Sequence, residues 1–198
     1  RDTTTNGQGR MELSEIYIDK NNWTIKEISR LRIPTPGLDV SYCEKNWVPI
    51  NDKPYHFVKW TSPTEIVEAN PETGESKQLS VVQGVVSPTD QRGGSQVLRW
   101  GNYYIAITHE VVLYKNYLKQ KNGTYRHRLC VWDDEFKLIG LSNSFSFLDG
   151  QIEFVCGAAI VDNNLAIGFG FQDNAAFILE VPQAVVDKMI EEALHAGL

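Results

Sequence analysis

The chain of 198 residues carries 25 acidic and 19 basic side chains, for a net charge of −6, and 42% of its residues are apolar. This composition is typical of a soluble globular chain that folds as one compact domain or two small ones. No apolar run reaches the ~18 residues of a membrane-spanning helix, so no membrane span is expected. Nucleic-acid binding is not expected either, because it requires clustered Lys and Arg and the basic residues here are dispersed.

The cysteines and histidines indicate neither a disulfide framework nor a metal site. Cys43, Cys130 and Cys156 are odd in number and widely spaced, and the spacing of the histidines matches no ligand pattern. The cysteines are therefore predicted to be buried thiols of the core. The first residues, RDTTTNGQGR, lack the pattern of a signal peptide, and a cytoplasmic location is favoured.

Short alternating or β-branched segments, bounded by Gly, Asn, Asp and Pro, run almost throughout the chain and predict an all-β protein with tight hairpins. An N-terminal hairpin is expected in residues 11–30, with its turn at residues 19–22. The other expected strands lie within residues 47–60, 64–69, 95–112, 125–132, 136–142 and 153–181.

Helical periodicity occurs once, after Pro182. Residues 183–194 place Val185, Val186, Met189 and Ile190 on one apolar stripe, which predicts a short amphipathic helix. Such a helix is expected to cover an exposed edge or the bottom of a sheet.

The turns recur at intervals of about 50–60 residues, each interval holding three or four strands, and this pattern is typical of β-propeller blades. A two-sheet sandwich is the alternative. The predicted units amount to about three and a half blades, whereas propellers close with about four to eight. Because the chain begins with Arg, we expect it to be the C-terminal part of a longer polypeptide, with blades in residues 1–181 and the helix in residues 182–198.

Four polar segments interrupt the apolar strand pattern where inner strands of different blades would meet. These segments are Glu44-Lys45-Asn46, Arg92-Gly93-Gly94-Ser95, Thr108-His109-Glu110 at a strand end, and Gln172-Asp173-Asn174. Because inner strands and their loops converge at one end of a propeller channel, we expect these polar side chains to be neighbours in space.

Several short motifs carry a resemblance to a known family. EKNWVPI, PYHFVKW, RGGSQVL, YYIAITHE, YRHRL and IEFVCGAAIVDNNLAIGFGFQDNAAF occur in this order over about two-thirds of the chain. The series resembles the later part of the five-bladed β-propellers of glycoside hydrolase family 130, the β-mannoside phosphorylases and hydrolases. It is also similar to related propeller mannosyltransferases and to propeller domains attached to bacterial glycosyltransferases.

The resemblance implies that Lys45, His109 and Tyr125 face a site where phosphate or a sugar hydroxyl is held, and that Asp173 binds sugar hydroxyls. The sequence departs from the family at two points. Gly170-Phe171-Gln172-Asp173 stands where the family has Gly-Ala-Ala-Asp, and the Asp-Pro-Arg-type motif of the general acid does not occur. Either that acid belongs to a region outside this chain, or the propeller binds carbohydrate without catalysis.

Inverting cleavage of a glycosidic bond needs an acid and, about 6.5–9.5 Å away, a carboxylate-activated water or an incoming phosphate. Lys45, Arg92 and a protonated His109 would suit phosphate, as would Arg126 or Arg128. His127 either faces the site or decorates an outer strand. The candidate catalytic residues are Asp173, Glu153 and His109, and the candidate substrate- or phosphate-binding residues are Glu44, Lys45, Asn46, Arg92, Tyr125 and His127.

Two hypotheses of function follow. The first is a carbohydrate-active propeller that acts on the glycosidic bond of a mannoside. The reaction would be inverting phosphorolysis, hydrolysis or glycosyl transfer. The alternative is a non-catalytic propeller that binds glycan or scaffolds a glycosyltransferase. No resident cofactor or metal is expected, and inorganic phosphate or a nucleotide sugar would be a co-substrate.

Overall fold

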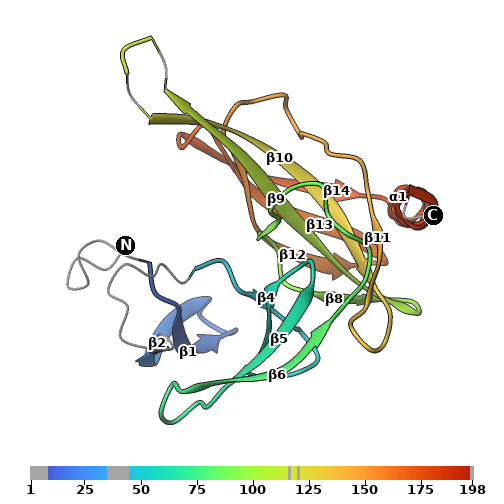
Figure 1. Cartoon of the computed structure of the whole chain (residues 1–198). Helices are drawn as coiled ribbons and strands as arrows, with labels where there is room; N and C mark the ends of the chain where they lie inside the picture. Colours follow the sequence, from blue (N-terminus) through green and yellow to red (C-terminus); the bar gives the residue numbers. More distant parts are fainter. Residues whose placement is uncertain (1–8, 35–44, 116, 120, 197–198) are drawn as a thin grey trace.

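A computed structural model describes residues 9–34, 45–115, 117–119 and 121–196 of the chain (Figure 1). Antiparallel strands dominate these residues, and one short helix follows the last strand. The prediction of an all-β protein with a short C-terminal helix is therefore confirmed.

The described strands form four sheets, with the orders β1-β2, β3-β4-β5-β6, β11-β10-β9-β7 with β8 also paired to β9, and β12-β13-β14. The elements are β1 (Glu12–Asp19), β2 (Thr24–Arg32), β3 (Val48–Pro49), β4 (His56–Trp60), β5 (Thr64–Ala69), β6 (Ser76–Val82), β7 (Arg92–Gly93), β8 (Leu98–Trp100), β9 (Tyr103–Lys115), β10 (Lys121–Trp132), β11 (Leu138–Leu141), β12 (Glu153–Val161), β13 (Asn164–Phe171), β14 (Ala175–Val181) and α1 (Gln183–Ala196).

The N-terminal hairpin of β1 and β2 is the predicted one. The Asp19 carboxylate accepts hydrogen bonds from the backbone N–H groups of Asn21 at 2.8 Å and Asn22 at 3.3 Å, which holds the turn. The hairpin is anchored at its base, where Ile33 is buried in an apolar cluster with Trp47 and Phe57. Most of its side chains are exposed, so the hairpin projects from the rest of the chain (Figure 1).

The structure extends the predicted strand pattern in two places. The strand β6 was not predicted, because its mostly exposed and polar sequence lacks a clear apolar alternation. The strand β9 continues beyond the expected residue 112 to Lys115, and β10 begins at Lys121 instead of Tyr125. His109 therefore lies in the interior of a strand, and the prediction that it lies at a strand end is wrong.

The C-terminal helix α1 closes one side of the largest apolar core. Its residues Val186, Ile190 and Ala193 are buried on one helical face, and they pack with residues of β8 to β10 and of β12 and β13. The Asp187 carboxylate accepts a hydrogen bond of 2.7 Å from the Trp100 indole N–H, which ties the helix to β8. The predicted covering role of this helix is confirmed.

The strands β3, β8 and β12, one from each of three sheets, lie side by side. Ile50, directly after β3, forms a parallel bridge with Val97, directly before β8. The Gln96 amide then links to β12, since the Ala158 N–H donates to Gln96 Oε1 at 3.0 Å and Gln96 Nε2 donates to the Ala158 carbonyl. Side chains from three separate sheets can therefore meet at one place.

The described residues do not form a closed ring of sheets. The structure establishes the all-β class, whereas the propeller with about three and a half blades remains a prediction. The division of the chain into blades in residues 1–181 and a helical part in residues 182–198 also remains a prediction.

The cysteine prediction is confirmed in one position and wrong in another. Cys130 is buried and free, whereas Cys156 is a free thiol on an exposed position of β12, because its side chain points away from the core-facing Val155 side of the strand. Cys43 lies outside the described residues.

Candidate functional site

The candidate site starts from the pairing register of three strands. His109 on β9 is the cross-strand partner of Arg92 on β7 and of His127 on β10. Paired residues of antiparallel strands project on the same face of the sheet. Three residues that were predicted from separate motifs therefore occupy one row across the sheet.

Aromatic rings surround His109 on this face. Tyr125 lies two residues before His127 on β10, so both side chains share the face. The His109 ring centroid is 5.6 Å from that of Tyr125 and 4.8 Å from that of Phe154 on β12. His109 itself is only 3% exposed, whereas Tyr125 and Phe154 are half-buried and offer part of their surface.

The segment of Lys45 and Asn46 packs directly against β7. A Cβ atom added to Gly93 would overlap the carbonyl oxygen of Asn46 and a methyl group of Val48. The charge of Lys45 also acts on His109, where it lowers the pKa of the imidazole. Lys45, Asn46, Arg92, His109 and Tyr125 are called the His109 cluster below.

The close approach of Gly93 to Asn46 gives a test of this packing. Gly93→Ala is expected to lower the free energy of unfolding by about 1–3 kcal/mol, because the backbone of the 45–46 segment must move to admit a methyl group. Urea denaturation followed by tryptophan fluorescence measures the change. Gly157→Ala is the matched control, since its Cβ would meet the Gln96 side chain at an ordinary 3.7 Å. Equal effects of the two variants would contradict the close approach.

Arg92 is held in a defined position at the cluster. Its guanidinium carbon lies 4.3 Å from the centroid of the Trp60 ring, and its Nη2 lies 2.9 Å from Oδ2 of Asp90. About a third of the side chain remains exposed. Stacking on an aromatic face leaves the edge of a guanidinium free to donate hydrogen bonds, so Arg92 can bind an anion from there.

The environment of His109 keeps its imidazole neutral at neutral pH. Burial, followed by the charges of His127, Lys45 and Arg92, lowers the pKa of His109 to about 4, against the weaker opposing effect of a hydrogen bond with the Gly93 backbone. The prediction that His109 is protonated is therefore wrong at neutral pH, and its binding of phosphate remains a prediction. In the described part of the chain, Nδ1 of His109 has no hydrogen-bond partner.

His127 does not decorate an outer strand, and that alternative is wrong. The ring is completely buried, with centroids 5.9 Å from Phe145 and 4.8 Å from Phe147. Burial lowers the pKa of His127 to about 4 despite the opposing charge of Glu153. Among the described residues neither ring nitrogen has a hydrogen-bond partner, so this histidine contributes a buried polar group beside His109.

Glu153 organises the loop that precedes β12. Its carboxylate is fully buried and accepts hydrogen bonds from three backbone N–H groups, those of Phe147 at 2.6 Å, Leu148 at 3.0 Å and Gly150 at 2.7 Å. Next to this loop, the Tyr125 N–H donates to the Gln151 carbonyl at 2.8 Å. The contacts of Glu153 therefore support the part of β10 that carries Tyr125, and its catalytic role remains a prediction.

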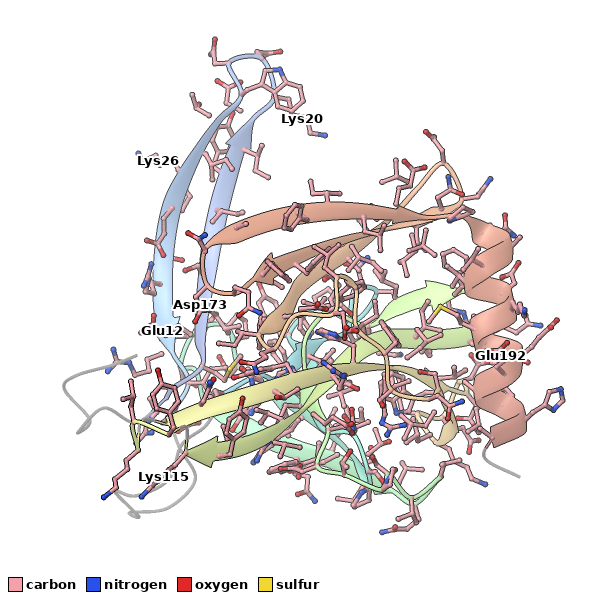
Figure 2. All side chains as sticks on the ribbon, turned by 90° about the horizontal axis from the view of Figure 1, so that it is seen from above. Glu12, Lys20, Lys26, Lys115, Asp173 and Glu192 are labelled. Atoms are coloured by element: carbon pink, nitrogen blue, oxygen red, sulfur yellow. The ribbon has the colours of Figure 1, made fainter. Side chains whose placement is uncertain are left out.

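Asp173 lies in the exposed turn between β13 and β14, at the end of the hairpin far from α1 (Figure 2). Asp173 and Gln172 both have positive φ angles, 52° and 54°, which a tight turn requires. The preceding residues connect this turn with the Glu153 loop, because the Gln172 N–H donates to the Ile152 carbonyl at 2.7 Å. Glu44 lies outside the described residues.

Arg126 and Arg128 point to the opposite face of β10 from Tyr125 and His127. Arg128 Nε lies 3.2 Å from a Glu110 carboxylate oxygen, and its Nη1 donates to the Ser142 carbonyl at 2.8 Å. Burial opposes ionisation of Glu110, but hydrogen bonds from Thr89 and Arg128 lower its pKa below the usual range. The two arginines therefore do not join the His109 cluster.

A separate apolar cavity of about 410 Å³ lies further along the same face of β9 and β10. It is bounded by Ile107 and Leu129, the pair next to His109 and His127 on this face, and by α1. Phe145 and Phe147, which cover His127, also line it. The cavity is therefore separated from His127 by these two rings.

Sequence reasoning missed the aromatic parts of the site, Trp60, Phe154, Phe145 and Phe147. Each lies in an apolar or alternating segment that looks like ordinary core packing. In the sequence, only their closeness to a polar candidate residue or a turn sets these aromatic residues apart. This is weak evidence until the strand pairing shows which residues lie next to one another.

Comparisons with known proteins identify no relative of the chain. No protein-family model matches the chain, and no significant match is found among curated proteins or solved structures. In the described residues, no three His, Cys, Asp or Glu side chains gather closely enough to hold one metal ion. The helix in the described part of the chain lacks the length and apolar character of a membrane-crossing segment.

Proposed function

We propose that the chain is part of a carbohydrate-active β-propeller and that the His109 cluster binds a glycoside together with an anionic group such as inorganic phosphate. One observation carries the proposal. Residues from three separate motifs, Arg92, His109 and Tyr125, meet around one row of paired strands, and the segment of Lys45 and Asn46 packs against β7 beside them. The strands β3, β8 and β12, which lie side by side, support the propeller part of the proposal.

The chemistry of the cluster suits a sugar. The Tyr125 hydroxyl, the Asn46 amide and a neutral imidazole can each exchange hydrogen bonds with hydroxyl groups. The half-buried rings of Tyr125 and Phe154 offer apolar surface for the C–H face of a sugar ring. Lys45 and Arg92 supply positive charge for phosphate or another anion, through charge-assisted hydrogen bonds.

The enzymatic form of the proposal is inverting phosphorolysis, hydrolysis or transfer at a mannoside. In it, Lys45 and Arg92 hold phosphate, and His109, neutral at neutral pH, lies beneath the Tyr125 ring. A carboxylic acid must protonate the leaving oxygen. Of the two candidate carboxylic acids, Glu153 is buried, whereas Asp173 lies in an exposed turn. Asp173 is therefore the candidate for the general acid.

The second candidate function is glycan binding without turnover. The contacts of Glu153 favour it, because three backbone N–H groups already occupy both carboxylate oxygens. A side chain that is fully buried and bound in this way does not reach a substrate. Under this function the His109 cluster recognises a glycan and presents it to a partner enzyme.

Titration calorimetry with β-1,4-mannobiose and inorganic phosphate tests the proposal on the full chain. Each of Lys45→Ala and Arg92→Ala is expected to weaken phosphate binding by about 10-fold or more, since each removes a charge-assisted contact. Lys77→Ala on β6, an exposed lysine outside the cluster, is the matched control and should bind as the wild type does.

Product analysis separates the two functions. Release of mannose or mannose 1-phosphate that is lost in Asp173→Asn supports the enzyme. Saturable binding without product supports the glycan-binding function. Absence of binding to both ligands, or equal binding by all three variants, would contradict the assignment of the site.

A further inference from the structure

The hairpin of β9 and β10 projects beyond the sheet that carries the His109 cluster (Figure 1). Figure 2 shows Lys115 at its outer end, away from the body of the molecule. The described residues of this end, 112–115 and 117–119, are called the hairpin tip below. The pairing of β9 with β10 continues to Lys115 and Lys121, so the strands carry the tip outward as a regular ribbon.

The hairpin tip exposes apolar and aromatic side chains on both of its faces. Val112 is 67% exposed and Tyr117 is 91% exposed. Leu113 follows Val112 in the strand and is also exposed, so its side chain lies on the opposite face. A flat protein surface could remove the apolar side chains of only one face of this hairpin from water. Insertion of the tip into a fluid layer would remove those of both faces.

The charge of this region is opposite to that of the chain. From Val111 to Lys121 the sequence contains three Lys and neither Asp nor Glu, whereas the whole chain has a net charge of −6. Lys115 and Lys119 are exposed at the tip itself. The tip therefore combines positive charge with exposed aromatic and aliphatic groups.

We infer that the hairpin tip docks on a membrane surface that contains anionic phospholipid. Tyrosine rings favour the headgroup region, where an apolar body and a polar hydroxyl are both accommodated. Lysines near the bilayer are attracted by anionic headgroups, and each contributes about 5-fold to the partition constant. The proposal concerns shallow insertion of the tip among the headgroups, and it is independent of the proposed sugar site.

The β1-β2 hairpin provides a matched comparison within the same chain. It also projects and exposes apolar residues, and its Trp23 is 84% exposed. From Glu12 to Arg32, however, it carries four acidic and four basic residues, so it has no net charge. If exposed apolar surface alone drove adsorption, this hairpin would bind as well as the hairpin tip.

Vesicle co-sedimentation of the full chain tests the inference, with phosphatidylcholine vesicles that contain or lack phosphatidylserine. The wild type is expected to bind only the vesicles with phosphatidylserine. The double variant Lys115→Gln/Lys119→Gln should bind roughly 30-fold more weakly, and Tyr117→Ser should also bind more weakly. The matched controls, Trp23→Ser and Lys20→Gln/Lys26→Gln, should bind as the wild type does. Raising the ionic strength from about 0.1 M to about 1 M should release the protein.

Three results would overturn the inference. They are absence of binding to anionic vesicles, binding that does not depend on lipid charge, and loss of binding in Trp23→Ser but not in Tyr117→Ser. If the tip lysines govern retention on an acidic protein or polymer while vesicles are not bound, the partner is not a membrane. Because Lys45 and Arg92 are unchanged in every variant, failure of this test is distinct from failure of the sugar site.

Discussion

Lowering the pH from about 7 to about 5 is expected to remove about 2 kcal/mol of unfolding free energy for each of His109 and His127. In the folded protein each imidazole has a pKa of about 4, because both rings are buried. In the unfolded chain the pKa returns to about 6.5. The unfolded chain therefore binds protons first as the pH falls, and stability is lost from about pH 6.5 down to the folded-state pKa values.

Urea denaturation at the two pH values measures this loss. His127→Phe should reduce the pH dependence and leave the stability at neutral pH unchanged or higher, since it replaces a buried ring whose polar atoms lack partners in the described residues. His195→Gln, at an exposed position of α1, is the control and should keep the wild-type pH dependence. An unchanged pH dependence in His127→Phe would contradict the burial of a neutral imidazole.

Glu153→Gln is expected to lower the free energy of unfolding by about 3 kcal/mol. The carboxylate accepts three backbone hydrogen bonds, whereas the amide of Gln offers one acceptor oxygen and places an NH₂ group against a backbone donor. The variant should also weaken ligand binding, because the loop that Glu153 holds supports the Tyr125 backbone.

Chemical denaturation measures the stability change, and amide hydrogen exchange at Phe147, Leu148 and Gly150 reports the loop directly. Glu135→Gln is the matched control, because Glu135 is exposed. A loss of less than about 1 kcal/mol, with unchanged exchange at the three amides, would contradict the structural role of the carboxylate.

Much of the strand pattern could be predicted from local sequence. The turns at residues 19–22 and 162–164 and the helix after Pro182 are marked by Asp, Asn and Pro and by apolar periodicity, which act over a few residues. The strand β6 could not be predicted, because its mostly exposed and polar residues lack an apolar alternation. The outer halves of β9 and β10 could not be predicted either, because their exposed residues do not alternate between apolar and polar.

The candidate site was predictable in part. The family resemblance marked Lys45, His109 and Tyr125, and the structure brings them together with Arg92. The separation of Tyr125 and His127 from Arg126 and Arg128 follows from the two-residue period of a strand. Arg126 and Arg128 therefore do not join the phosphate ligands that the sequence suggested. The role of Glu153 was hidden from the sequence because its partners are backbone N–H groups of a loop, which leave no side-chain pattern.

The most direct test of the proposed site is a histidine-ring NMR titration of the full chain with β-1,4-mannobiose, with and without inorganic phosphate. The four histidines serve as internal probes, because His109 lies in the cluster whereas His56 and His195 lie on other elements. We expect the ring signals of His109 to shift with saturation while those of His56 and His195 stay in place. Unchanged His109 signals at ligand saturation, or shifts confined to His56 or His195, would contradict a carbohydrate site at the His109 cluster.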